Sequence, residues 1–536
     1  MKLISASFFA VLFMVVASAG VYAASDHSKF GELRKNFNTP EDVTRTCLGC
    51  HTLAGQEVMK TSHWQWSKKA VNYPGKEREK VHIGKKNLIS NFFPGIASNE
   101  ANCTRCHIGY GWRDDDSFLG NASKIDCLVC HDQSGKYVKS LNGSGYPSVN
   151  ETNYQTAAAS VGRPTNKNCG QCHFESHGEG SGVLRGDLTK ALIRKDSGDI
   201  DIHMSPADRK MVCVDCHSTK KHDIKGRVYS LSGGSKDRVS CENCHTSNPH
   251  TQKRYVEESS TVGEDGRYEI FDYRTMLFGR EKPANTFKSR LLDKHYEKVS
   301  CQACHINHYA TTGKTRLSWD WSKAGQKPAD ESKMRDGDGA ILFSMEKGEF
   351  KLGANLVPEY RLLGGRVSHV LVGDKIDPQG TVLLNPSVDA ETDGKIWPVK
   401  VMRAKQPYDV KNNTMIVPKI FGEAGSGAYF SDRDWQKAAT AGMKAAGLEF
   451  SGEIGWVDTE MVLPINHMVG GKKSALKCED CHSRDGRLAG IQAGWVPGRD
   501  RVLFLDILGI LMVLGALGGV LFHGFLRYTF HHKKGE

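Results

Sequence analysis

The sequence predicts a mainly α-helical and irregular fold with few short strands and one transmembrane helix near the C-terminus. Three observations predict this fold class. The motif Cys-x-x-Cys-His occurs eight times in the 536 residues. Only 39% of the residues are hydrophobic, although the chain is long enough for about two or three ordinary domains. Residues 502–526 form a largely apolar stretch that is long enough to cross a bilayer as one helix.

The repeated motif is the attachment signature of a c-type haem. Two thiols separated by two residues can form thioethers with the two vinyl groups of one haem, and the following histidine can bind its iron. For a single Cys-x-x-Cys pair, a zinc knuckle or a disulfide is the alternative. The eight motifs use all 16 cysteines, and each pair precedes one of only 22 histidines, so we predict eight covalent haems. The attachment residues are Cys47, Cys50, His51, Cys103, Cys106, His107, Cys127, Cys130, His131, Cys169, Cys172, His173, Cys213, Cys216, His217, Cys241, Cys244, His245, Cys301, Cys304, His305, Cys478, Cys481 and His482.

Porphyrin is expected to replace much of the aliphatic core. Each ring supplies apolar surface locally, so short helices joined by long irregular connections suffice to cover it. The predicted architecture is therefore a mainly α/irregular multihaem cytochrome c fold with a haem-packed core and one C-terminal transmembrane helix.

The two ends of the chain predict its location. Residues 1–24 read as a secretory signal peptide, with Lys2, an apolar run over 8–17 and small residues near Ala23, and the run is short for a membrane span. The apolar helix 502–526 precedes a basic tail, 527–536, which favours a cytoplasmic C-terminus. We therefore expect a periplasmic haem region with a single anchor in the inner membrane.

The chain between these ends divides by haem density. Residues 25–305 hold seven motifs, and residues 306–477 form a haem-free insert with alternating apolar patches near 352–363 and 399–402, which predict short strands and loops. Within the insert, 431–434 predicts a helix start with Asp434 in a capping-box position, and Gly447 predicts its end. The eighth motif and a linker occupy 478–501. A glycine-rich loop over 178–182 lacks the Gly-Lys-Ser/Thr sequence of a phosphate loop.

The formal net charge of +11 does not predict a nucleic-acid partner. Each haem brings two propionates, which together nearly cancel the positive charge, and no nucleic-acid recognition motif is present. The expected partners are redox proteins: an inner-membrane cytochrome b or another quinol-linked subunit, and a periplasmic redox partner. The sequence does not indicate an oligomeric state.

Histidines outside the motifs are candidates for the second axial position of each iron. Eight of the 22 histidines belong to motifs and three follow residue 520. Eleven candidates remain: His27, His63, His82, His177, His203, His222, His250, His295, His308, His369 and His467. Ligation by two histidines keeps a haem at low potential relative to histidine–methionine ligation, and neighbouring low-potential haems conduct electrons.

Several stretches together resemble the octahaem tetrathionate reductase family of c-type cytochromes. The resemblance covers roughly residues 26–490 and is carried by the sequences at 27–30, 61–64, 83–87, 109–112, 127–132, 169–174, 248–250, 301–306 and 319–322. It implies a haem-packed fold with seven bis-histidine haems and one active-site haem at the second motif. It also favours seven distal ligands, which are His27, His63, His203, His222, His250, His295 and His467, with His177 in reserve.

Two positions depart from the family pattern at the reactive haem. The distal lysine that the resemblance implies falls at Arg185, whose guanidinium stays protonated and has no lone pair for iron. A family cysteine falls at Phe93, and the membrane helix is a further difference from soluble members. Two hypotheses follow. The first is a cytochrome that carries electrons between a quinol-linked membrane partner and periplasmic acceptors. The second is a terminal reductase of tetrathionate, nitrite or hydroxylamine at the second motif, with Arg185, Lys85 or Lys86 as the substrate-facing cation.

Overall fold

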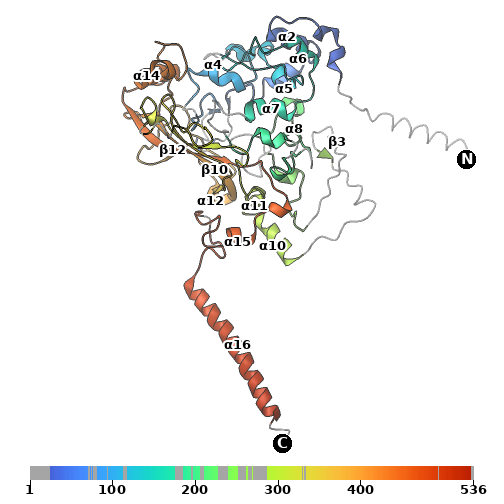
Figure 1. Ribbon diagram of the computed structural model, residues 1–536, viewed down its shortest axis with the longest axis vertical. Coiled ribbons are helices and arrows are strands. Elements are labelled where there is room, and N and C mark those ends of the chain that lie inside the picture. The colour runs from blue at the N-terminus through green and yellow to red at the C-terminus, as the bar shows by residue number, and fades with distance from the viewer. Residues whose placement is uncertain are drawn as a thin grey trace, which may run out of the picture.

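The computed structural model of the chain consists of a body of short helices and strands and one long helix that projects from it (Figure 1). The structure describes residues 25–69, 73, 75–76, 81–92, 95–112, 117–174, 185–194, 197–205, 210–226, 239–251, 261–262, 268–269, 286–328, 330, 334–492 and 494–532. The signal peptide predicted for 1–24 therefore lies outside the described residues, as do His177 and Phe93.

The attachment motifs lie on short helices or turns, as expected. The longest of these helices, α2 (Pro40–Cys50), starts with Thr39 as its cap, because the Thr39 side chain accepts from the Asp42 backbone while Asp42 accepts in return. The other motif elements are η3 (Thr104–Cys106), α5 (Leu128–His131), α7 (Asn166–His173), α8 (Cys213–Cys216), η9 (Cys241–Asn243), α11 (Cys301–His305) and α15 (Cys478–Cys481). They follow one another from the top of the body down to the side nearest α16 (Figure 1).

The remaining helices and turns lie before or between the motif elements, within the haem-free insert or, for α16, after the last motif. They are η1 (His27–Lys29), η2 (Gly31–Leu33), α3 (Ala54–Val58), α4 (Glu100–Cys103), η4 (Ser117–Gly120), η5 (Ala122–Lys124), α6 (Tyr154–Ala159), η6 (Lys190–Ile193), η7 (Ser197–Asp199), η8 (Lys220–His222), α10 (Phe287–His295), η10 (Trp321–Lys323), α12 (Ala390–Asp393), α13 (Tyr429–Asp432), α14 (Trp435–Ala445), η12 (Lys472–Ser474) and α16 (Leu503–His532).

The haem-free insert folds as a sheet, and two of its strands are longer than the sequence led us to expect. The strands are β5 (Thr315–Asp320), β6 (Phe343–Ser344), β7 (Gly348–Gly353), β8 (Glu359–Leu363), β9 (Val382–Leu383), β10 (Lys395–Asp409), β11 (Thr414–Met415) and β12 (Ile454–Pro464). Strand β10 has 15 residues and pairs antiparallel with β12 from Val399 to Asp409, antiparallel with β8 over its first four residues, and parallel with β5. Its buried residues lie on both faces, so the alternation that marks a half-exposed strand is weak in its sequence.

The order of this eight-stranded sheet is β6-β7-β5-β10-β12-β9, with β8 and β11 also paired to β10. Its core contains Trp319, Trp321, Phe350, Met402 and Tyr429. Two-residue ladders join β1 (Lys68–Lys69) to β2 (His82–Ile83) and β3 (Thr261–Val262) to β4 (Tyr268–Glu269).

Helix α14 packs against this sheet and matches its predicted span. Asp434 is the N-cap itself and accepts from the Lys437 backbone at 3.0 Å, so its predicted capping-box position is corrected by three residues. Gly447 follows the helix with φ of +69°, a left-handed conformation that suits glycine and ends the helix.

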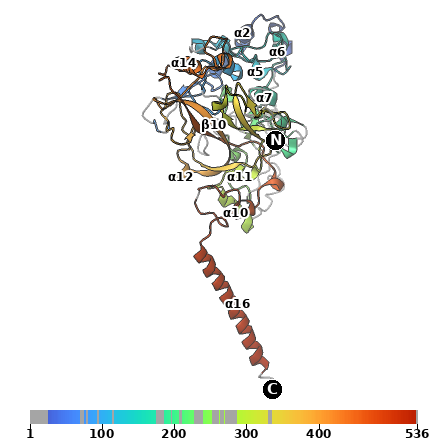
Figure 2. The same ribbon diagram turned by 60° about the vertical axis from the view of Figure 1, so that its left-hand side comes forward.

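The C-terminal helix α16 carries its apolar side chains on the outside. It covers and extends the predicted 502–526, and 29 of its residues form a segment long and apolar enough to cross a membrane, with none of its most apolar window buried in the body. It points away from the body in both views (Figures 1 and 2).

Candidate functional site

Six motif histidines face a second histidine at the separation that one iron would require. Two imidazoles bound to opposite sides of one metal ion by bonds of about 2 Å have ring centroids about 6 Å apart. The observed centroid separations are 6.1 Å for His27–His51, 6.3 Å for His63–His173, 6.4 Å for His131–His222, 6.2 Å for His203–His245, 6.4 Å for His217–His467 and 5.9 Å for His295–His482. The residues therefore fit the haem groups that the motifs predict.

A seventh pairing is indicated by electrostatics. Burial lowers the pKa of His305 in the seventh motif, and the charges of His250 and His203 add to this lowering. Six of the seven histidines favoured as distal ligands thus face a different motif histidine, and the seventh, His250, acts electrostatically on His305.

The Nδ1 atoms of four distal candidates face carboxylates. His222 contacts Glu57 at 2.8 Å, His250 contacts Asp293 at 2.8 Å and His467 contacts Asp187 at 3.2 Å. His203 lies 3.6 Å from the carboxylate of Asp201. A carboxylate behind a metal-binding histidine fixes the ring orientation and increases the basicity of the nitrogen that faces the metal.

Backbone carbonyls hold several of the remaining rings. The Nδ1 atoms of His131, His217 and His482 lie 2.8 to 2.9 Å from the carbonyl oxygens of Gly162, Lys225 and Pro497. His295 contacts the Leu291 carbonyl at 2.8 Å in the same way. In the pairs His131–His222, His217–His467 and His295–His482, both Nδ1 atoms are therefore engaged and both Nε2 atoms remain for iron.

The second motif differs from the other seven. Its histidine, His107, is 6% exposed, and no second imidazole lies at ring-contact distance from it among the described residues, although the charge of His63, which faces His173, also acts on it. Indole rings surround it instead, with ring centroids of Trp112 at 3.6 Å, Trp66 at 5.1 Å and Trp64 at 6.2 Å. Both ring nitrogens are buried without a well-aligned hydrogen bond in the described part of the chain, although the Trp64 backbone acts on the pKa of His107. Among the described residues, His107 is therefore the motif histidine without a facing imidazole at ring-contact distance, whereas the reserve candidate His177 lies outside the described residues.

The three cations predicted for this reactive site differ in their relation to His107. Burial holds the pKa of His107 well below its ordinary value, and Lys85 and Lys139 add to this, so Lys85 lies near His107. Lys85 also contributes to lowering the pKa of His173 to about 4, after burial and His63. Lys86 is exposed, and its backbone N–H donates to the Trp66 carbonyl at 3.2 Å.

Arg185 is held by the Pro464 carbonyl of β12 and by the Asp187 carboxylate. Its Nη2 donates to the Pro464 carbonyl at 2.8 Å, its Nε lies 3.4 Å from the Asp187 carboxylate, and its charge acts on His173. Burial would raise the pKa of Asp187, but Arg185 and His467 hold it well below its usual range. Arg185 and the distal candidate His467 therefore share one buried carboxylate.

A buried ion pair next to His107 is not evident from the sequence. The Lys139 side chain, 3% exposed, donates to the Asp126 carboxylate at 2.9 Å and to the His107 carbonyl at 3.0 Å. Asp126 also accepts from the Tyr110 hydroxyl at 3.0 Å. Since Asp126 directly precedes Cys127, this pair joins the second motif to the third. The pair joins one lysine and one aspartate that are 13 positions apart, and neither belongs to a recognisable sequence motif.

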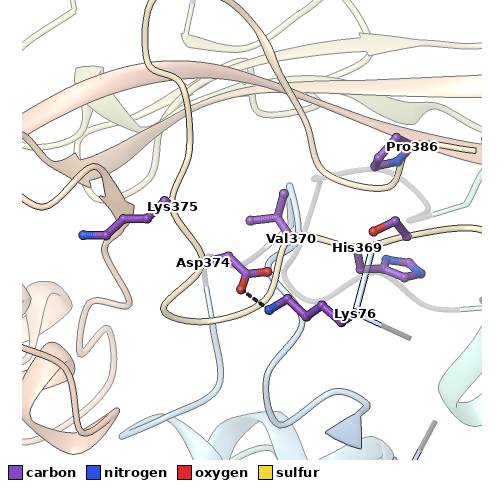
Figure 3. A pocket seen from close by; sticks show the side chains of 7 residues that line it. Lys76, His369, Val370, Asp374, Lys375 and Pro386 are labelled. Carbon is purple, nitrogen blue, oxygen red and sulfur yellow. Dashed lines mark hydrogen bonds and ion pairs between the residues drawn. The ribbon is translucent and has the colours of Figure 1, made fainter. Parts of the chain in front are cut away.

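Three other histidines from the candidate set lie away from the motif histidines. His82 is exposed on β2, and His308 is half-buried. His369 is buried at the edge of a cavity of about 380 Å³ that is also lined by Lys76, Val370, Asp374 and Lys375 (Figure 3). Lys76 and Asp374 form an ion pair across this cavity at 2.7 Å.

Cysteines of different motifs lie beside one another and give the order in which the haems are neighbours. The side chains of Cys47 and Cys127, of Cys106 and Cys172, and of Cys169 and Cys213 lie next to each other. Electrostatic contacts join Cys130 to Cys169, Cys216 to Cys244 and Cys304 to Cys481, while His203 lies close to His305. Numbered by motif, the succession runs 1-3-4-5-6-7-8, and the second motif branches from the fourth.

Comparison with known proteins agrees with this geometry. The family model described as "Cytochrome c bacterial" matches residues 316–485, and that described as "Cytochrome c554 and c-prime" matches residues 191–246. An uncharacterised protein of Archaeoglobus fulgidus is 25% identical over 251 residues, which are 37% of this chain and 80% of that relative. The crystal structure of an octahaem cytochrome c from Shewanella oneidensis is 35% identical, with a TM-score of 0.72 over 88% of this chain and 95% of that chain.

The repeated attachment motifs, the facing histidines and these similarities define a multihaem c-type cytochrome with covalently bound haem. Within that class, the chain belongs to the octahaem tetrathionate reductase family. The predicted fold class, a mainly helical and irregular haem-packed body with an apolar C-terminal helix, is confirmed.

Proposed function

We propose that this chain is a periplasmic octahaem cytochrome, anchored in the inner membrane, that carries electrons between a quinol-linked membrane partner and periplasmic acceptors. All eight motifs carry haem in this proposal. The observation that supports it is the unbroken succession of neighbouring motifs from the eighth, on α15 near the start of α16, to the first and second at the far end of the body.

Seven histidine pairs hold the irons that conduct in this proposal. They are His27–His51, His63–His173, His131–His222, His217–His467, His203–His245, His250–His305 and His295–His482. A haem held by two imidazoles supplies reversible one-electron chemistry at low potential. Oxidation of one quinol to quinone releases two protons and supplies two electrons, which reduce two ferric sites.

The experiment uses membranes that contain the full chain. Addition of a membrane-soluble quinol is expected to produce the reduced haem absorbance band, followed by full reduction with dithionite. Reduction by dithionite but not by quinol, in membranes of the source organism, would contradict the proposal.

A second function is favoured by one observation. Because no imidazole among the described residues faces His107 at ring-contact distance, the haem of the second motif is the one expected to offer a face to a small oxidised nitrogen or sulfur compound, and Lys85 is the predicted cation whose charge acts on His107. The chain would then be a terminal reductase of tetrathionate, nitrite or hydroxylamine at this motif.

Oxidation of a reduced viologen dye by each of these three compounds tests the reductase hypothesis. If Lys85 attracts the anionic substrates, Lys85→Gln is expected to lower kcat/KM by about tenfold for nitrite and tetrathionate, and less for hydroxylamine. Lys136→Gln, which removes an exposed lysine elsewhere, serves as the control. No dye oxidation with any of the three compounds excludes this second function.

A further inference from the structure

The segment between the eighth motif and the membrane helix is packed onto the body rather than forming a flexible linker. Leu488, Ile491 and Val496 are each 7 to 8% exposed and belong to one core cluster with Ala303 and Tyr360. Ala303 lies between the two cysteines of the seventh motif. The apolar side chains of this segment are therefore buried against residues of the last two motifs, Ala303 and Cys481.

Arg499 holds this segment together through hydrogen bonds from its guanidinium group. Its Nη1 donates to the carbonyls of Leu488 at 2.9 Å and Ile491 at 2.7 Å, and its Nη2 donates to the carbonyl of Gly494 at 2.9 Å. Its Nε and Nη2 also pair with the Asp500 carboxylate at 2.8 and 2.7 Å. The planar guanidinium is suited to this many fixed acceptors, which an ammonium cannot satisfy at once.

The same segment holds the axial histidine of the eighth motif. The Pro497 carbonyl lies 2.9 Å from His482 Nδ1. Gly498 has φ of +81°, and a side chain there would bring its Cβ to 2.3 Å from the His482 carbonyl oxygen, so the backbone passes close to the motif at this point. The position of His482 is thus coupled to the turn that Arg499 stabilises.

The membrane helix begins directly after this turn. Only Arg501 and Val502 separate Asp500 from α16, and Asp506 N–H already donates to the Val502 carbonyl at 3.0 Å. Two residues are too few for a flexible tether. Trp495, 65% exposed beside the turn, is the type of side chain that settles at a membrane interface.

We propose that residues 482–500, here called the mount, fix the eighth haem at the periplasmic surface of the bilayer and make it the port for electrons from a quinol-linked membrane protein. This inference rests on the proposed electron-transfer function and adds the site at which the membrane partner reacts. Arg499 is a positioning residue in the mount, because it holds the Pro497–His482 contact and the direction of α16 together.

The test uses Arg499→Ala and Arg499→Lys in the full chain in membranes, with Arg501→Ala as the matched control, since Arg501 is an exposed arginine two residues away. Both Arg499 variants are expected to increase hydrogen–deuterium exchange over 488–500 and to raise the reduction potential of one haem, because His482 loses its carbonyl contact. They are also expected to slow reduction by quinol by about tenfold, while Arg501→Ala stays near wild type.

The outcomes separate this inference from the proposed function. If quinol reduces wild type and both Arg499 variants at the same rate although exchange over 488–500 has increased, the port lies elsewhere and the inference is overturned. If exchange over 488–500 is unchanged in Arg499→Ala, the mount does not depend on Arg499 and the inference is likewise overturned. If quinol fails to reduce even the wild-type chain, the electron-transfer function itself fails.

Discussion

At the residue scale, the haem sites differ in the groups that contact the Nδ1 atoms of their histidines. His222, His250 and His467 contact carboxylates, whereas His131, His217 and His482 contact carbonyl oxygens. A carboxylate stabilises the ferric state more than a neutral acceptor does, because it adds negative charge behind the ligand. The third, fifth and seventh haems, and the sixth through the longer His203–Asp201 contact at 3.6 Å, are therefore expected to have the lower potentials.

Glu57→Gln tests this charge effect at the third motif. The amide keeps an acceptor for His222 but removes the negative charge, so the potential of one haem is expected to rise by roughly 60 mV, the equivalent of a tenfold change in a one-electron equilibrium. A spectroelectrochemical titration measures it, with the exposed Glu32→Gln as the control. Identical titration curves for both variants would show that the carboxylate does not tune the haem.

Lys400 predicts a pH dependence of stability. It is fully buried in β10, its Nζ donates to the Thr315 hydroxyl at 2.6 Å, and burial followed by Arg316 holds its pKa well below the ordinary value. The folded chain thus binds fewer protons here than the unfolded chain between the lowered pKa and about 10.4. The contribution of this group to stability therefore rises with pH, by up to about 1.4 kcal/mol per pH unit.

Lys400→Met is expected to remove this rise. Urea unfolding of wild type and variant between about pH 7 and pH 9.5 measures it, because that range lies below the ordinary lysine pKa. Lys405→Met, at a partly exposed position on the same strand, is the control. An equal pH slope in Lys400→Met and wild type would mean that Lys400 is charged in the folded chain.

The sequence predicts from spacing which cysteines and histidines attach haem, and the family resemblance favours seven distal ligands, six of which face a different motif histidine in the structure. The residues that orient these histidines could not be predicted. The Asp187–His467 and Glu57–His222 contacts join residues 280 and 165 positions apart. Such contacts depend on the tertiary fold, and single aspartates and glutamates carry no signal for them.

At the scale of elements, the helices were easier to predict than the sheet. Asp434 and Gly447 mark α14 by local chemistry, namely a side-chain cap and a left-handed turn. The length of β10 depends on its pairing with β5, β8 and β12, which come from distant parts of the chain. A central strand buried on both faces also loses the alternation by which strands are recognised.

Asn91 joins the segment before the second motif to this sheet. It is fully buried, donates to the carbonyls of Met402 and Thr459, and accepts from Gln406 and from the Thr459 hydroxyl at 2.7 Å each. Asn91→Ala leaves these groups unsatisfied and is expected to lower the free energy of unfolding by about 3 kcal/mol. Chemical denaturation measures the loss, with the exposed cap variant Asn121→Ala, expected near 1 kcal/mol, as the control. Equal losses would contradict the role assigned to Asn91.

At the scale of the whole molecule, the order of the haems differs from the order of the motifs. The second motif branches from the fourth through Cys106 and Cys172 instead of lying between the first and third. The second and third motifs start only 24 residues apart, at Cys103 and Cys127, and the Lys139–Asp126 pair joins them through the His107 carbonyl. The sequence spacing could not show that Cys106 of the second motif lies beside Cys172 of the fourth, or that Cys127 of the third lies beside Cys47 of the first.

Intact mass tests the number of haems. The mature chain is expected to carry eight haem equivalents, and a Cys103→Ala, Cys106→Ala variant is expected to carry seven, because the other motifs keep their own cysteines. A pyridine haemochrome assay on the same samples gives an independent count. Fewer than eight in the wild-type chain would contradict the assignment of every motif.

The central claim is that seven irons are held by two histidines and that the iron at His107 is not. Low-temperature EPR of the oxidised full-length protein, with and without cyanide or nitrite, tests it most directly. We expect low-spin signals from seven haems and one high-spin ferric signal that an added ligand converts to low-spin, lost in the Cys103→Ala, Cys106→Ala variant. Only low-spin signals, unmoved by either ligand, would mean that the second haem is also capped, and would leave electron transfer as the sole function.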